Sequence, residues 1–403
     1  MGPVLLCDKS TIQSLHRHAP DTLHRYFTIA VPSILVFEIL GDLTKKEKAG
    51  GPNLTRELAH RIAAFSTVPL VDFRHLIAAE LNGTRVRMDH RPQLSAKRVL
   101  QSDKGEYGIE IAEDPCEELL HRWRRGDFSH TDVVASTMWR NRKERMNWRH
   151  LLLKLEGIYS PSMKPKKSFE EVTNFVEDLI AAEPRFLRSW FLREFDVLKN
   201  RDFPTEDEAL VGNSYLIFCI RITLFALWSM KFDLLSTKAD NQLDLEYLFY
   251  LPFTNAFTAQ DRFPKRLASL FLRGNQRFVD HGDLAHDLRR ISEIDRKWYE
   301  GGVNEPPPRR GPPPGENSIC LELWQTFMKP GYADSPPLKL SPDQEERMLS
   351  HILSLMKSPE IQNNNIDSDN ATFLFRQRTI SGSDSCPCGS GKSFSDCHGA
   401  TMK

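Results

Sequence analysis

Short apolar runs alternate with helical patterns in the first part of the chain. Strand-like runs occupy residues 4–7, 27–31 and 67–73, and two more follow at 255–259 and 276–279. Short apolar runs of this kind are typical of buried strands. Strands that alternate with helices predict an α/β fold built on a parallel sheet. The helices expected around these strands span 10–15, 34–43, 54–65, 75–81, 244–251, 264–272 and 285–294.

The pattern changes between residues 85 and 203, where charged and Trp-rich helical periodicity replaces the alternation and strand signals are nearly absent. We therefore expect a discontinuous α/β core at 1–83 and 205–300, interrupted by a helical insertion at 84–204. The helices expected in this insertion span 117–125, 132–144, 148–155, 169–182 and 185–198.

Two features bear on the compartment. Residues 215–230 form the longest apolar run, but the run carries Arg221 and is short for a membrane span, so it predicts a buried core helix. Asp8 and Lys9 interrupt the apolar N-terminus, which excludes a signal-peptide pattern. We expect a cytoplasmic protein with no membrane contact. Four cysteines outside the C-terminal region are isolated, as expected of buried thiols in a reducing compartment: Cys7, Cys116, Cys219 and Cys320.

The region after residue 300 is rich in proline and polar residues. Residues 304–317 read NEPPPRRGPPPGEN, a composition typical of a semi-rigid linker. A short helix is expected at 344–356, followed by a polar tether at 357–385. We expect a linker with a short helix at 301–380 and a small separate unit at 381–403.

The chain carries no net charge, because Lys+Arg and Asp+Glu both number 54. No overall field therefore steers it to nucleic acid, and any such contact requires a local patch. Segments 121–125 and 139–150 place cations beside Trp123, Trp139 and Trp148, a combination that binds single-stranded nucleic acid. The alternative is that the tryptophans anchor helices in the core. We favour that alternative for the tryptophans and leave the role of the arginines open.

Four carboxylates fall at related positions. Asp8 and Asp261 directly follow apolar strands, Glu38 lies on a helix, and Asp244 begins one. Ligands bind at the carboxyl ends of strands in open parallel sheets. Clustered carboxylates there bind Mg²⁺ or Mn²⁺, which activates water for phosphodiester hydrolysis.

An ordinary structural role is the alternative for two of these acids. Aspartate favours helix caps and turns, so Asp8 can cap the helix at 10–15. Asp244 can likewise be an acid in the first turn of its helix. Asp8 and Asp261 each come directly after an apolar strand, and this placement favours the metal site.

The arrangement of strands and acids resembles the PIN-domain nucleases. The matching blocks are LLCD at 5–8, VPSILVFE at 31–38 and DLEYLFYLPFTNAFTAQD at 244–261. The resemblance covers residues 1–83 and about 205–300, roughly half of the chain.

This resemblance implies a three-layer α/β/α core and a divalent-metal-dependent endoribonuclease acting on RNA. The catalytic acids it implies, which would hold one or two Mg²⁺ or Mn²⁺ ions, are Asp8, Glu38, Asp244 and Asp261. The chain departs from compact PIN domains in the gap of more than two hundred residues between the second and third acids. Asp240 or Glu246 could therefore share the role of the third acid.

The C-terminus carries a second chemical motif. Cys386-Pro-Cys388 is followed, after eight intervening residues, by Cys397-His398, and this Cys₃His set can bind one tetrahedral Zn²⁺. A disulfide between the first two cysteines would be strained. The embedded GSGKS lacks the spacing of a phosphate-binding loop.

Residues 386–399 resemble the SEC-C motif, a zinc knuckle found on many otherwise unrelated bacterial proteins. Four protein ligands close the coordination sphere, so the zinc is expected to be structural and to support recruitment of a partner. An alternative function follows. The PIN-like core can be a catalytically inert scaffold that binds a protein partner through its zinc-binding tail, as the neutral charge and the widely separated acids suggest.

Overall fold

The computed structural model describes the greater part of the chain up to residue 328. The described residues are 2–15, 19–47, 62, 67–93, 96–101, 107–111, 122–123, 148–156, 164–195, 197, 214–236, 241–300, 312–328 and 393. The helices expected at 132–144 and 344–356, most of the one at 54–65, and the four cysteine and histidine ligands lie outside these residues.

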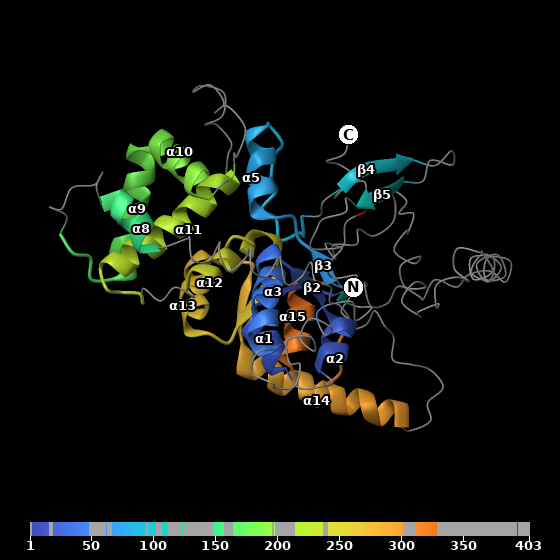
Figure 1. The fold of residues 1–403 in the computed structure, drawn as a ribbon. Coiled ribbons are helices and arrows are strands. Elements are labelled where there is room, and N and C mark those ends of the chain that lie inside the picture. The colour runs from blue at the N-terminus through green and yellow to red at the C-terminus, as the bar shows by residue number, and fades with distance from the viewer. Residues whose placement is uncertain are drawn as a thin grey trace.

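A five-stranded parallel sheet forms the centre of the fold, with the strand order β3-β2-β1-β6-β7 (Figure 1). In the central strand, Leu5 is paired with Ile29 on one side and with Ala256 on the other. The prediction of an α/β fold with a parallel sheet is confirmed. The strands are β1 (Val4–Cys7), β2 (Thr28–Val31), β3 (Thr67–Pro69), β6 (Ala256–Ala259) and β7 (Arg277–Asp280).

Helices cover both faces of the sheet and give three layers. Helix α2 (Ala19–Tyr26) lies in the connection from β1 to β2, and α13 (Arg262–Phe271) connects β6 to β7. These connections run in opposite directions across the sheet, so right-handed crossovers place the two helices on opposite faces. Helix α14 (His281–Glu300) packs on α2, and α12 (Asn241–Leu248) packs on α13.

Helix α15 (Ile319–Phe327) also belongs to the core, although the sequence indicated only a linker there. It packs against α14, and its Trp324 side chain donates a 2.6 Å hydrogen bond to the carbonyl oxygen of Tyr26. Asp287 of α14 accepts hydrogen bonds from the Ser318 hydroxyl at 2.7 Å and from the Cys320 amide at 3.0 Å. The start of α15 is thereby tied to α14.

Four helices form a group beside the sheet: α8 (Trp148–Glu156), α9 (Phe169–Ala182), α10 (Pro184–Glu194) and α11 (Ser214–Lys231). The predicted helices at 148–155, 169–182 and 185–198 are confirmed, with the last ending earlier. Helix α11 contacts the other three and also reaches α5 (Phe73–Leu81) and α12. It is long and apolar enough to cross a membrane by composition, yet 78% of it is buried in the protein. The expectation of a core helix is therefore confirmed.

The expectation that strands are nearly absent from the insertion is wrong. Strands β4 (Ala96–Gln101) and β5 (Tyr107–Ile111) pair there as a two-stranded antiparallel sheet. The signal was present in YGIEI, where Tyr107, Ile109 and Ile111 alternate with other residues. This period of two is typical of strands and was obscured by the charged residues around it.

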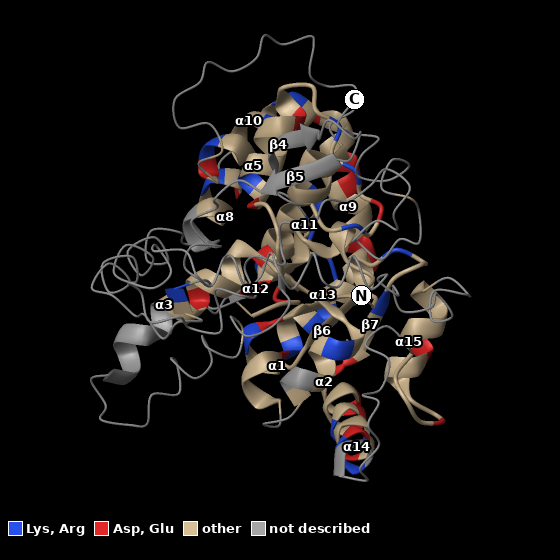
Figure 2. Cartoon of the chain, turned by 90° about the vertical axis from the view of Figure 1, so that its right-hand side faces the viewer, with Lys and Arg blue, Asp and Glu red and all other residues tan. Residues whose placement is uncertain are grey.

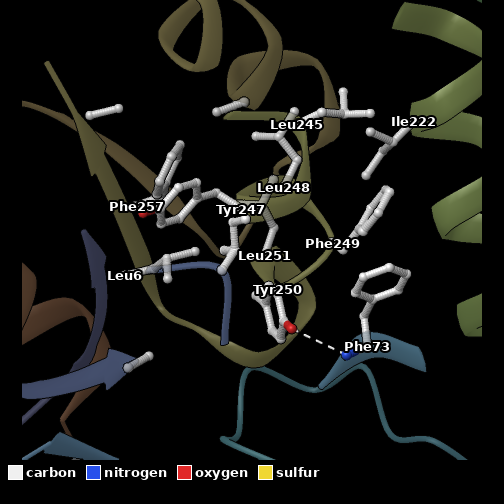
Figure 3. Packing of buried hydrophobic residues seen from close by; sticks show 14 of the residues in the cluster. Leu6, Phe73, Ile222, Leu245, Tyr247, Leu248, Phe249, Tyr250, Leu251 and Phe257 are labelled. Atoms are coloured by element: carbon white, nitrogen blue, oxygen red, sulfur yellow. Dashed lines mark hydrogen bonds between the residues drawn. The ribbon is translucent and has the colours of Figure 1, made fainter. Parts of the chain in front are cut away.

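The core continues from the sheet to α11 through the segment after α12. Figure 3 shows Leu6 and Phe257 of the sheet on one side of this segment and Ile222 of α11 on the other. The ring of Phe249 packs against that of Phe73, with centroids 4.9 Å apart. Trp123 is buried, as the core interpretation predicted, and Trp139 lies outside the described residues. Three of the isolated cysteines are buried free thiols: Cys7, Cys219 and Cys320.

Candidate functional site

The carboxyl edge of the sheet brings two of the predicted acids together. Asp8 directly follows β1, and Asp261 lies just beyond β6 at the start of α13. The two strands are parallel neighbours in which Cys7 is paired with Thr258, so both acids leave the sheet at the same edge. This edge is where open α/β sheets bind their ligands.

Asp8 accepts hydrogen bonds from one backbone amide in the helix that follows it and from another at the end of β6. Its Oδ1 accepts a 2.7 Å hydrogen bond from the amide of Thr11 and caps α1 (Lys9–Ser14), which confirms the capping interpretation. Its Oδ2 accepts a 3.3 Å hydrogen bond from the amide of Gln260, just after β6. Asp8 is only 2% exposed. The cap therefore fixes a buried carboxylate beside the start of α13.

Asp261 is exposed and lies beside this buried acid. It accepts a 2.8 Å hydrogen bond from the hydroxyl of Ser10 through Oδ2. Burial raises the pKa of Asp8, and the negative charge of Asp261 adds to the increase, whereas the hydrogen bonds from Thr11 lower it. The pair is thus electrostatically strained when both groups are ionised, and a bound cation would relieve the strain.

Glu38 lies on α3 (Ser33–Glu47) and is engaged through both oxygens. Its Oε2 accepts a 2.6 Å hydrogen bond from the hydroxyl of Tyr247, and the ammonium of Lys9 lies 3.9 Å from Oε1. Tyr247 is fully buried on α12. Burial raises its pKa most. The charge of Glu38 adds to this increase, and the charges of Asp8 and Asp244 add smaller amounts. The tyrosine hydroxyl therefore lies within the field of three of the four predicted acids.

Sequence reasoning missed Tyr247, although a signal existed. It stands three residues after Asp244 in DLEYLF, a spacing that places the two on one face of α12. Asp244 itself lies in the first turn of α12, as the ordinary structural role predicts.

The structure does not gather all four acids around one ion. Among the residues that it describes, no group of three or more His, Cys, Asp or Glu side chains is placed to hold a metal. The four-carboxylate cluster stays a prediction. The closely placed pair is Asp8 and Asp261, and Mg²⁺ is often bound through one or two carboxylates together with water and substrate phosphates.

The candidates for a substitute third acid are not at the pair. Asp240 lies outside the described residues. Glu246 is buried. Burial lowers the pKa of Arg74 in the first turn of α5, but the hydrogen bonds and charge of Asp72 and, to a lesser extent, the charge of Glu246 raise it overall. Glu246 therefore belongs to a neighbouring polar cluster.

That cluster is built around Asp72, the cap of α5. Asp72 forms a two-bond ion pair with Arg74, with both bonds 2.7 Å long, and accepts a 2.8 Å hydrogen bond from Ser33. Burial opposes its ionisation, but the hydrogen bonds and charge of Arg74 outweigh burial and lower the pKa of Asp72 to about 2. The hydroxyl of Tyr250 contacts Ser33 and accepts a 3.1 Å bond from the Phe73 amide (Figure 3). The Arg74 guanidinium neutralises the charge of Asp72, so we interpret this cluster as structural.

The predicted zinc ligands lie outside the described residues, and sequence comparison tests this region instead. Residues 383–400 match the SEC-C motif. The match includes all four predicted ligands, namely Cys386, Cys388, Cys397 and His398. Comparison with curated proteins and with solved structures gives no significant match for the chain.

The SEC-C motif is generally a metal-binding, zinc-related motif, and the match confirms this part of the resemblance. The donor atoms of this chain fit zinc, since three thiolates and one imidazole satisfy a tetrahedral ion. Because protein ligands fill every position in such a set, the SEC-C motif leaves none for a substrate.

Proposed function

We propose that this chain is a divalent-metal-dependent endoribonuclease whose centre is the pair Asp8 and Asp261. The observation that carries the proposal is the placement of buried Asp8 and exposed Asp261 together at the carboxyl ends of adjacent parallel strands. The resemblance of the surrounding blocks to PIN-domain nucleases supports the same reaction class. The strand order, with β1 at the centre, places the pair at the middle of the sheet edge.

The roles of the residues follow from their contacts. Asp8 and Asp261 would hold Mg²⁺ or Mn²⁺, which supplies an activated water and stabilises charge on the phosphate when bound. The hydroxyl of Ser10 orients Asp261, and the amides of Thr11 and Gln260 orient Asp8.

The other predicted acids lie beside this pair. Tyr247 and Lys9 hold Glu38, and the ammonium of Lys9 is placed to meet an anionic substrate beside the carboxylates. Asp244 adds negative charge near Tyr247. We assign Glu38 and Asp244 to the outer part of the metal site, where they would act through bound water.

For the tail we propose a structural Zn²⁺ held by the SEC-C ligands. With its coordination sphere filled by protein, this unit would recruit a protein partner or RNA rather than catalyse a reaction.

Cleavage of defined RNA and DNA strands with increasing Mg²⁺ or Mn²⁺ tests the proposal. Asp8→Asn and Asp261→Asn should each lower the cleavage rate by more than the roughly 10–100-fold typical of residues that only support a ligand. The matched control is Asp283→Asn, which removes an exposed carboxylate from the first turn of α14. It should cleave at the unchanged rate.

Undiminished cleavage by both site variants would refute the carboxylate centre. Absence of metal-dependent cleavage in the unaltered protein would instead favour the inert scaffold. In that case a protein partner should be retained by the full chain and lost on removal of residues 381–403.

A further inference from the structure

The exposed face of α13 carries a strip of cations that begins directly after Asp261. Arg262, Lys265 and Arg266 are exposed, whereas Phe263 and Leu267 on the same helix are buried. Positions separated by three and four residues share one helix face, so the three cations lie side by side. The strip therefore starts at the carboxylate pair and continues along the helix.

A second basic segment, almost a hundred residues earlier in the sequence, lies next to this strip. The guanidinium of Arg266 sits 4.9 Å from the ring centroid of Phe169, at the start of α9. Phe169 packs at 5.5 Å on Phe225 of α11, and Phe225 packs at 5.4 Å on Phe271 of α13. This aromatic chain fixes the start of α9 beside α13, and the sequence just before it is Lys164-Pro-Lys-Lys167.

The cations of the two segments outnumber the acids near them. Lys164 and Lys167 are exposed, and Lys166 lies over the ring of Phe175. Lys265 forms an ion pair with Asp280, while Arg262 forms no ion pair with another described residue. The acids at this surface are Glu170 and Glu171, in the first turn of α9, together with Asp280 and Asp261. In Figure 2 the blue segments gather around α13, β6 and β7.

We infer that this basic surface, formed by residues 164–167 with Arg262, Lys265 and Arg266, holds the phosphate backbone of a single-stranded RNA and directs it to Asp261. The inference rests on the proposed function, because the strip meets the carboxylates at one end. Lysine and arginine side chains contact phosphates without reading sequence, which suits a surface that positions a strand.

One property of this surface favours RNA over a membrane. The exposed face of α13 offers only Leu270, at 44% exposure, as a large apolar side chain, and membrane-surface helices bury a broad apolar face. The chain as a whole carries no net charge, so the surface acts locally rather than through a general attraction to polyanions.

Fluorescence anisotropy with a labelled single-stranded RNA of mixed sequence tests the inference. The measurement uses the full chain carrying Asp8→Asn, so that cleavage does not interfere. Arg262→Glu, and separately the double variant Lys164→Glu with Lys167→Glu, should weaken binding. Each lost phosphate contact should also lower the slope of log affinity against log salt by about 0.7. The control is Arg289→Glu on exposed α14, which should bind as the parent does.

Variants that bind RNA as tightly as the parent and the control variant would overturn the inference. So would a parent chain that binds phosphatidylserine vesicles through these residues but fails to bind RNA. If RNA binding depends on Arg262 but the unaltered protein does not cleave RNA, the surface is supported and the proposed nuclease is refuted. Normal cleavage by the charge-reversed variants would retain the nuclease and refute the surface.

Discussion

Tyr247 donates a 2.6 Å hydrogen bond to Glu38 and thereby joins α12 to α3 across 209 positions of the sequence. Burial and three nearby carboxylates keep the tyrosine protonated, so its hydroxyl remains a donor. Lys9 approaches the other oxygen of Glu38. The hydrogen bond from Tyr247 and the approach of Lys9 together hold the Glu38 carboxylate in position at one side of the predicted acidic site.

Replacing Tyr247 by Phe should therefore destabilise the fold. The change removes a hydrogen bond to a charged group, which contributes about 1.5–3 kcal/mol. The control is Tyr215→Phe, because the hydroxyl of Tyr215 donates a 3.1 Å hydrogen bond to the neutral carbonyl of Phe249. That bond is expected to contribute about 0.5–1.5 kcal/mol. Urea unfolding at neutral pH measures both, and an equal loss in the two variants would contradict the assignment.

Two substitutions of Asp8 should distinguish the contribution of its helix cap to stability from that of its charge. Asn at this position retains an oxygen for the amide of Thr11 and removes a buried charge beside Asp261. We expect Asp8→Asn to unfold at the same or a higher temperature, whereas Asp8→Ala should lose about 1 kcal/mol with its cap.

The pH dependence of Asp8 has a defined sign. Its folded-state pKa lies above the ordinary value of 3.8, so its stabilising contribution is complete below 3.8 and is lost as the pH rises through the folded value. Any advantage of Asp8→Asn in thermal unfolding should therefore shrink as the pH falls toward 3.8. A variant that is equally destabilised at every pH would show that the charge is not strained.

The ion pair of Asp72 and Arg74 should affect the free energy of unfolding in a different pH range. The pKa of Asp72 is lowered from 3.8 to about 2, so its contribution is present above 3.8 and is lost as the pH falls through 2. Asp72→Asn should lower the free energy of unfolding by about 1.5–3 kcal/mol near neutral pH. This difference from the unaltered protein should vanish in acid. Asp283→Asn, at an exposed carboxylate, provides the control in urea titrations across this range. A cost that persists at pH 2 would refute the electrostatic account.

The sheet and the capping role of Asp8 were predictable because the relevant signals are local. Strands β1, β2 and β6 are short runs in which every residue is buried, so each reads as apolar. Asp8 stands three residues before Thr11, which is the spacing of a helix cap. The alternation of strands and helices then limits the topology to a few arrangements.

Other features could not be read from the sequence because they depend on distant segments. Helix α15 follows a proline-rich stretch, and its place is set by the contact of Trp324 with Tyr26, 298 residues away. The proposed basic surface joins two segments through the packing of Arg266 on Phe169. Neither segment alone differs from an ordinary solvated helix end. The position of Tyr247 against Glu38 likewise requires α3 and α12 to be folded side by side.

The tail offers a test that is independent of the carboxylates. Residues 383–400, which match the SEC-C motif, contain Phe394 as the one large apolar side chain, so this segment is too poor in apolar surface to fold without its metal. We expect elemental analysis to find one zinc ion per chain. Cys386→Ser and Cys388→Ser should lose it, whereas Ser395→Ala, within the same segment, should retain it.

Chelation of the zinc should then act on the tail alone. After chelation, limited proteolysis should cleave the region around the motif, because zinc binding and folding of such a segment are coupled. The thermal transition of the core should stay unchanged, since all four predicted ligands come from the motif and none from the buried core between Val4 and Met328. Protein purified under reducing conditions without zinc would refute the site. A core transition that falls on chelation would show instead that the metal supports the α/β fold.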